Sequence, residues 1–164
     1  MLQIRLNILA IGLSMFSFAD AFAQDKYAVV VGVEAYSGTF DPLDYANEDA
    51  RELGKALESL GFTTIVMTSD AANSTHRPST PEKIATIIKT VAGSCEPGDA
   101  MLVSLSGHGV QFSDESIGPS GTRETYFCPQ DATLSNKVSL MKISSLMDFM
   151  NPVSYTHLTL PTKA

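Results

Sequence analysis

Cysteine and basic residues are scarce in this chain, and tryptophan is absent. Two cysteines among 164 residues are too few for a disulfide-stabilised scaffold or a four-thiolate zinc site. Lys and Arg number 11 against 18 Asp and Glu, a formal net charge of −7. We therefore expect no nucleic acid partner, because binding to a phosphate backbone requires clustered basic side chains. The 44% of hydrophobic residues is typical of one globular domain with its own core.

The long apolar stretch at the N-terminus, Leu6–Ala19, is shorter than the roughly 20 residues that a membrane-spanning helix needs. It follows a positive charge at Arg5 and precedes the small residues of Ala21-Phe22-Ala23. This order predicts a secretory signal peptide over residues 1–23 and a mature, exported chain that starts at Gln24, periplasmic or secreted. No stable membrane span is expected after cleavage. The alternative is a buried N-terminal helix.

Short apolar, β-branched runs alternate with amphipathic segments along the rest of the chain. This alternation predicts an α/β fold, with a parallel sheet covered by helices on both faces. The long polar stretches are expected to be loops, and Gln111–Arg123 is rich in Gly and Ser and expected to be mobile. The predicted strands are Tyr27–Val33, Phe62–Met67, Ala100–Leu105 and Glu124–Cys128; the predicted helices are Ala46–Leu60, Thr80–Ala92 and Lys142–Met150.

The third predicted strand ends in Ser106-Gly107-His108-Gly109. Ligands bind at the carboxyl ends of the strands in open parallel sheets. Glycines on both sides of His108 leave its ring uncrowded and let a substrate approach the Gly109 amide. Imidazole exchanges protons in the neutral pH range, so His108 is a candidate general base and acid. The alternative is a histidine that only caps the sheet through hydrogen bonds.

Four segments in order resemble the caspase-like cysteine peptidases, particularly the metacaspase- and paracaspase-type proteins of bacteria. The resemblance covers Lys26–Asn151 and includes the Ser-Gly-His-Gly motif. It implies a three-layer α/β/α caspase-like fold with a mostly parallel central sheet, truncated here, whose N-terminal part spans residues 24–152. The four segments are Tyr27–Tyr36, Leu43–Leu60, Asp99–Gln111 and Glu124–Ala132.

The resemblance also implies a mechanism and a substrate. A cysteine thiolate attacks the scissile carbonyl of a protein or peptide, and His108 generates that thiolate and protonates the leaving amine. The Gly109 N–H helps to stabilise the oxyanion. Metacaspase-type members cleave after Arg or Lys, and Asp49 occupies the position of an aspartate that helps to form their acidic pocket. The alternative for Asp49 is a solvated carboxylate in the first turn of a helix.

No cofactor is implied. Calcium activates some relatives of the metacaspase type, but it depends on carboxylates near the nucleophile and cannot be predicted here.

The sequence departs from the family where the nucleophile is expected. Caspase spacing places the cysteine about 50 residues beyond the histidine, near residue 158, where the chain has none. Cys95 and Cys128 are interpreted as small packing residues, with a disulfide between them as the alternative in an exported protein.

Residues 153–164 resemble the translation of a sequencing adaptor, and Pro161 would interrupt a central strand. The alternative is a natural edge strand with alternating Thr and Leu. We therefore interpret the chain as the N-terminal part of a longer peptidase, itself expected to be inactive.

Two other functions stay open. One is a pseudopeptidase that keeps the fold as a binding or scaffolding module. The other is an unrelated parallel α/β domain, such as a receiver- or flavodoxin-like module. Against the latter, Gly32–Tyr36 has no phosphate-binding glycine pattern.

Overall fold

The computed structural model describes residues 24–38, 40–113, 123–150 and 158–159. The signal peptide predicted over 1–23 lies outside the described residues, as does most of the tail predicted over 153–164, so both stay predictions. In the part of the chain that is described, no helix has the length and apolar character needed to cross a membrane.

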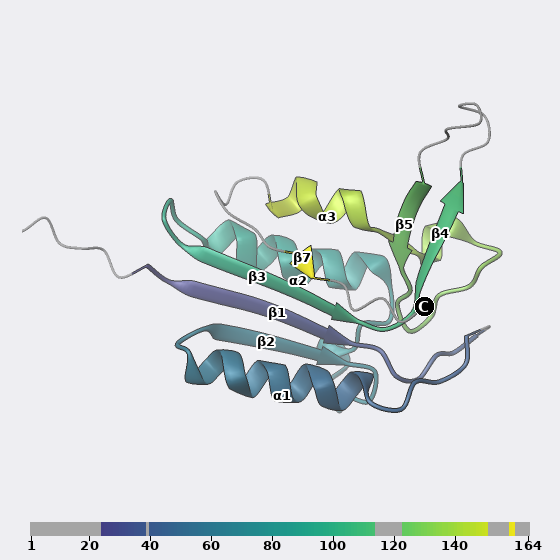
Figure 1. Cartoon of the computed structure of the whole chain (residues 1–164), viewed down its shortest axis with the longest axis horizontal. Coiled ribbons are helices and arrows are strands. Elements are labelled where there is room, and N and C mark those ends of the chain that lie inside the picture. Colours follow the sequence, from purple (N-terminus) through teal and green to yellow (C-terminus); the bar gives the residue numbers. More distant parts are fainter. Residues whose placement is uncertain (1–23, 39, 114–122, 151–157, 160–164) are drawn as a thin grey trace, which may run out of the picture.

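The main sheet has four parallel strands in the order β2-β1-β3-β7. Helix α1 covers one face of this sheet, and α2 and α3 lie together over the other (Figure 1). The predicted three-layer α/β/α arrangement with a parallel central sheet is therefore confirmed. The bounds are β1 Lys26–Gly32, α1 Ala46–Ser59, β2 Thr63–Thr68, α2 Pro81–Ser94, β3 Ala100–Ser106, α3 Ile143–Met150 and β7 Leu158–Thr159.

Burial on both faces explains why β1 is a continuous apolar run. Successive side chains of a strand point to opposite faces. Accordingly, Val29 and Val31 pack with Ile84 and Ile88 of α2, and Ala28 and Val30 pack with residues of α1. The four β1 side chains are at most 1% exposed. Strand β1 therefore lies at the centre of the core. Its carboxyl end determines where the following loop leaves the sheet.

A second, antiparallel sheet follows β3 in the order β4-β5-β6. Its strands are β4 Gly109–Ser113, β5 Arg123–Phe127 and β6 Met141–Lys142. The predicted mobile loop over 111–123 is wrong at both ends, because Gln111–Ser113 belong to β4 and Arg123 to β5. Val110 and Phe112 alternate with polar residues, a period of two that the Gly and Ser content obscured. Residues 114–122 lie outside the described residues.

Two short 3₁₀ helices lie between the predicted strands and helices. They are η1 Ser74–His76 and η3 Lys137–Ser139. His76 is exposed in η1.

Helix α2 begins where a capping residue predicts it. The Thr80 side chain accepts a hydrogen bond from the Lys83 N–H at 3.4 Å, and Pro81 occupies the first turn. We expect Thr80→Ala to lower the free energy of unfolding by about 1 kcal/mol, because one N–H of the first turn loses its partner. Thr80→Ser keeps a hydroxyl and is the matched control. Urea denaturation measures both, and equal losses for the two variants would contradict a capping role.

Candidate active site

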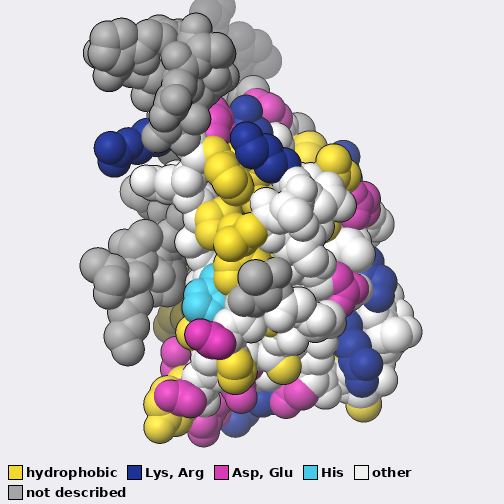
Figure 2. Space-filling model, turned by 90° about the vertical axis from the view of Figure 1, so that its right-hand side faces the viewer, with side chains coloured by type: hydrophobic (Ala, Val, Ile, Leu, Met, Phe, Trp, Pro, Cys, Tyr) yellow, Lys and Arg dark blue, Asp and Glu magenta, His cyan; other side chains and the backbone are white. Residues whose placement is uncertain are grey.

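His108 lies at the carboxyl edge of the main sheet, directly after β3 and before β4. Its side chain is half-buried, and Gly109 beside it is exposed. Figure 2 shows a histidine at the surface next to a stripe of hydrophobic side chains. The edge position agrees with the expectation that chemistry occurs where parallel strands end.

Tyr36, in the loop that follows β1, fixes the backbone of His108. The His108 N–H donates to Tyr36 Oη at 2.8 Å, and the same hydroxyl donates to the Val33 carbonyl at 3.2 Å. Gly107 makes this contact possible, because a Cβ there would lie 2.9 Å from Tyr36 Oη and 2.9 Å from Cε2 of Phe127. The loop after β1 and the turn after β3 are thereby joined.

Burial raises the pKa of Tyr36 to about 12, an effect that the His108 N–H partly opposes by stabilising the phenolate. The phenol therefore keeps its proton at neutral pH and can donate to Val33 while it accepts from His108.

The imidazole of His108 is held by two aromatic rings and one carbonyl. Its centroid lies 5.3 Å from that of Phe40 with the rings stacked, and 5.0 Å from that of Tyr36. Nε2 lies 2.9 Å from the Asp41 carbonyl oxygen. Because a carbonyl only accepts hydrogen bonds, a neutral ring in this position carries its proton on Nε2. The lone pair is then on Nδ1, which makes Nδ1 the basic nitrogen of the site.

A buried polar network supports the loop that carries Tyr36. Ser69 Oγ accepts from the N–H groups of Glu34 and Ala35 at 3.1 and 3.2 Å. Asn47 Oδ1, at the start of α1, accepts from the backbone N–H and the hydroxyl of Ser69, both at 3.1 Å. Asn47 and Ser69 are 4% and 5% exposed, so each polar atom must find its partner inside the protein.

Sequence reasoning missed the roles of Phe40, Asp41, Asn47 and Ser69. Two signals were available in the sequence. Ser69 is a polar residue directly after β2, and Asn47 is a polar residue in the first turn of α1. Asp41 contributes only its backbone carbonyl, so no residue type at that position would have indicated the contact.

Gly109 presents its backbone to solvent. In an antiparallel pair, opposed residues alternate between exchanging backbone hydrogen bonds with each other and pointing those groups outward. The Cys128 N–H donates to the His108 carbonyl at 2.9 Å, so this carbonyl faces Cys128, while the His108 N–H donates to Tyr36 Oη instead. The N–H of Gly109, one residue on, points away from β5. This is the orientation that an oxyanion donor requires; the role itself stays a prediction.

Asp49 is exposed in the first turn of α1, beside Glu48. Helix α1 starts at the carboxyl edge of the sheet, the same edge as His108 (Figure 1). Among the described residues, no hydrogen bond or ion pair joins the Asp49 carboxylate to His108. Asp49 therefore lies at the same edge of the sheet as His108, but it is not among the groups that hold the imidazole.

Both cysteines are free thiols in the structure, so the disulfide alternative is not realised. Cys128 follows β5, is completely buried, and burial raises its pKa to about 12. Cys95 ends α2, where its Sγ lies 3.3 Å from the Val91 carbonyl oxygen, and burial raises its pKa as well. A nucleophilic cysteine requires the opposite shift, toward thiolate. Both residues therefore suit packing better than catalysis.

We expect Cys128 to resist modification by an aromatic disulfide reagent in the folded protein and to react after unfolding in urea. In the folded Cys95→Ser variant, the reagent should then release almost none of its aromatic thiolate at neutral pH. The Cys128→Ser variant is the control, because half-buried Cys95 should react slowly but measurably. Rapid labelling of native Cys128 would contradict the packing interpretation.

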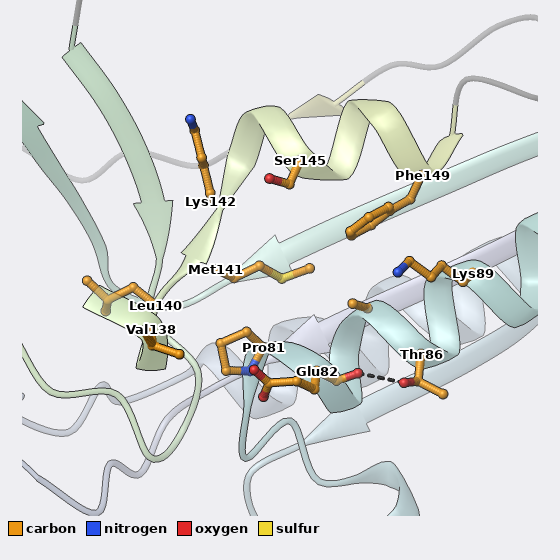
Figure 3. Close-up of a pocket in the computed structure, with 11 residues that line it drawn as sticks. Pro81, Glu82, Thr86, Lys89, Val138, Leu140, Met141, Lys142, Ser145 and Phe149 are labelled. Carbon is orange, nitrogen blue, oxygen red and sulfur yellow. Dashed lines mark hydrogen bonds between the residues drawn. The ribbon is translucent and has the colours of Figure 1, made fainter. Parts of the chain in front are cut away.

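A cavity of about 390 Å³ lies elsewhere, between α2, α3 and the segment from η3 to β6. Figure 3 shows Lys89 beside the ring of Phe149 on one side and Pro81 with Glu82 on the other. The Lys89 Nζ atom lies 4.1 Å from the ring centroid, a cation–π contact. His108, Gly109 and Asp49 are not among the residues that line this cavity. In the described part of the chain, no three His, Cys, Asp or Glu side chains form a group that could hold a metal ion.

The family model of the caspase domain matches residues 25–152, which is most of the chain. The chain belongs to the caspase domain family. At the level of the family, this assigns the chain to a family of peptidases. The crystal structure of protein GSU0716 from Geobacter sulfurreducens has a similar fold, with a TM-score of 0.63 and 19% sequence identity.

The similar region covers 82% of this chain and 48% of the Geobacter protein, so the chain spans about half the length of that structural relative. No curated protein is similar enough to count as a match.

Proposed function

We propose that this caspase domain belongs to a cysteine endopeptidase in which His108 is the general base and acid. The observation that carries the proposal is the contact between His108 Nε2 and the Asp41 carbonyl oxygen at 2.9 Å, which leaves Nδ1 basic. The nucleophilic cysteine is proposed to lie on a strand beside β3, beyond residue 152. Support for this position comes from the spacing of caspases, in which the cysteine lies about 50 residues beyond the histidine.

The proposed reaction has two stages. His108 Nδ1 accepts the thiol proton, and the thiolate attacks the scissile carbonyl to form a tetrahedral oxyanion. The outward N–H of Gly109 donates to that oxyanion. The imidazolium then gives its proton to the leaving amine as the carbon–nitrogen bond breaks. Water, with its proton taken by the same ring, hydrolyses the thioester and restores the thiol.

The test is hydrolysis of fluorogenic peptides by the full-length protein, expressed from the gene with the natural segment that follows the codon of Pro152. We expect turnover that an alkylating reagent abolishes by modifying one cysteine within that segment. Absence of turnover, or turnover that survives alkylation, would contradict the proposal. An Asp-x-Cys-x-x-Gly element in that segment would support it before any assay.

Cleavage after Arg or Lys is the finer part of the proposal, with Asp49 in the acidic pocket. We expect Asp49→Asn in the full-length protein to lower kcat/KM for peptides with Arg at the cleavage position by about tenfold, the effect of roughly 1.4 kcal/mol. Glu48→Gln is the matched control, because it removes an equal charge from the same first turn of α1. Equal effects of the two variants would exclude a specific role of Asp49.

A pseudopeptidase is the second candidate. It would apply if the segment after Pro152 lacks a cysteine, because Cys95 is half-buried and Cys128 is buried, and both suit packing better than catalysis. Replacement of the expected cysteine by Ser or Gly in the segment after Pro152 would select this function.

In either case, we propose that the predicted signal peptide exports the protein. Cleavage after Ala23 in a secretion assay would test this proposal.

A further inference from the structure

The cavity between α2, α3 and the segment from η3 to β6 has the size of a small-ligand site. Its volume of about 390 Å³ lies within the range of roughly 300–1,000 Å³ that ligand pockets occupy. Both helices and the segment before β6 contribute apolar side chains to its wall. These residues are Pro81, Ala85, Val138, Leu140, Met141 and Phe149. The wall therefore favours an occupant whose own side chains are apolar.

Two side chains of opposite charge lie at the two ends of this apolar wall. Glu82 and Lys89 are exposed, line the cavity and lie two turns apart on the same side of α2. In Figure 3, the ammonium group of Lys89 lies beside the ring of Phe149, and Glu82 lies beside Pro81. The seven residues from Glu82 to Lys89 correspond to about 10 Å along the helix axis, at a rise of about 1.5 Å per residue.

Within the described ranges, neither of these two charges is neutralised by an ion pair. Lys89 Nζ lies 4.1 Å from the centroid of the Phe149 ring, a contact that uses no hydrogen-bond acceptor. Lys142, the other cation of the lining, pairs with Glu124 at 3.0 Å. The cavity therefore presents a carboxylate at one end and an ammonium group at the other, a pattern that complements a ligand with the opposite charges at its ends.

We propose that this cavity binds short apolar peptides with free termini, with the peptide amino group at Glu82 and the peptide carboxylate at Lys89. An extended chain spans about 3.3–3.6 Å per residue, so a tripeptide matches the separation of about 10 Å between the two charges. Its side chains then contact Ala85, Met141 and Phe149. His108 is not among the lining residues, so the inference does not depend on the proposed function.

The test is an NMR titration of the ¹⁵N-labelled chain, and of the full-length protein, with the tripeptide Val-Leu-Val. The matched ligands are its N-acetylated form, its C-terminal amide and triglycine. We expect Val-Leu-Val to shift the amide signals of Ala85, Lys89 and Phe149. Each blocked form should bind about fivefold more weakly, the upper end for an exposed ion pair, and triglycine should bind more weakly than Val-Leu-Val because it lacks apolar side chains.

A substitution at Lys89 separates recognition of the carboxylate from other effects. Lys89→Gln should weaken the binding of Val-Leu-Val about fivefold and leave the binding of the amide unchanged, because the amide has no carboxylate to lose. Lys83→Gln is the matched control. Lys83 belongs to the same helix, but its Nζ donates to the Ser74 carbonyl at 2.9 Å and it does not line the cavity.

Equal affinity for the free and blocked peptides, equal effects of the two lysine variants, or shifts confined to the turn at His108 would each overturn the inference. Loss of binding in the full-length protein would overturn it as well, because a later segment of the chain would then occupy the cavity. The comparison of free and blocked peptides uses the unmodified protein, so it does not depend on the folding of a variant.

Discussion

Replacing His108 with alanine in the full-length protein is expected to lower kcat/KM for peptide hydrolysis by about 10³-fold, within the range that general acid–base catalysis contributes. The variant lacks the base that deprotonates the thiol and the acid that protonates the leaving amine. The imidazole acts on the thiol proton and on the leaving amine, so KM should change little and the loss should fall on kcat. Initial rates over a range of peptide concentrations measure both quantities.

His76→Ala is the matched control, because His76 is exposed in η1 and has no part in the site. Its kcat/KM should equal that of the unmodified protein. A His108→Ala variant with near-normal kcat, or an equal loss in both histidine variants, would remove His108 from the mechanism.

Replacing Gly32 with valine is expected to cost 3 kcal/mol or more in the free energy of unfolding, an order-of-magnitude figure for overpacking against a rigid backbone. A Cβ at Gly32 would lie 2.3 Å from the Ala46 carbonyl oxygen and 2.8 Å from the Ala50 Cβ. Both neighbours belong to α1, so the helix would have to move away from β1 and expose the apolar face that it covers. For a domain of about 5–15 kcal/mol stability, the loss is large.

Gly93→Ala tests the same kind of change where there is space. Nothing lies within 4 Å of a Cβ at Gly93, which is near the end of α2. Alanine there should stabilise the protein by about 0.5–1 kcal/mol, because glycine is a poor helix residue. Urea denaturation measures both variants. A Gly32→Val protein within about 1 kcal/mol of the unmodified one would show that α1 is not packed as described.

The layers of the fold were predictable because they depend on local patterns. Burial of β1 on both faces requires the continuous apolar run of Tyr27–Val33, and the amphipathic spacing of Ala50 and Leu57 marks the face of α1 that covers it. The start of helix α2 could be placed to the residue by Thr80 and Pro81, although the helix runs to Ser94, beyond the predicted end at Ala92. Of the β4–β5 hairpin, only β5 was predicted. Strand β4 was missed because a Gly- and Ser-rich stretch hides the period of two in Val110 and Phe112.

The candidate site was predictable only at its centre. The glycines around His108 are a local signal, and the turn they form does place the ring at the sheet edge. The groups that orient the ring come from the loop after β1: the Tyr36 hydroxyl, the Phe40 ring and the Asp41 carbonyl. These contacts join segments about 70 residues apart, as the separation of 72 between Tyr36 and His108 shows. Such pairing is set by strand order and register, which one sequence does not display.

The central claim is that His108 is held with a basic Nδ1 ready to accept the proton of a thiol. Two-dimensional ¹H–¹⁵N NMR of the imidazole, recorded on the full chain at a pH where the ring is neutral, reports directly which nitrogen carries the proton. The account predicts protonated Nε2 and unprotonated Nδ1, with Tyr36→Phe leaving that tautomer in place and an Nε2–H that exchanges slowly because it is bonded to the Asp41 carbonyl. A ring protonated on Nδ1 would contradict the account.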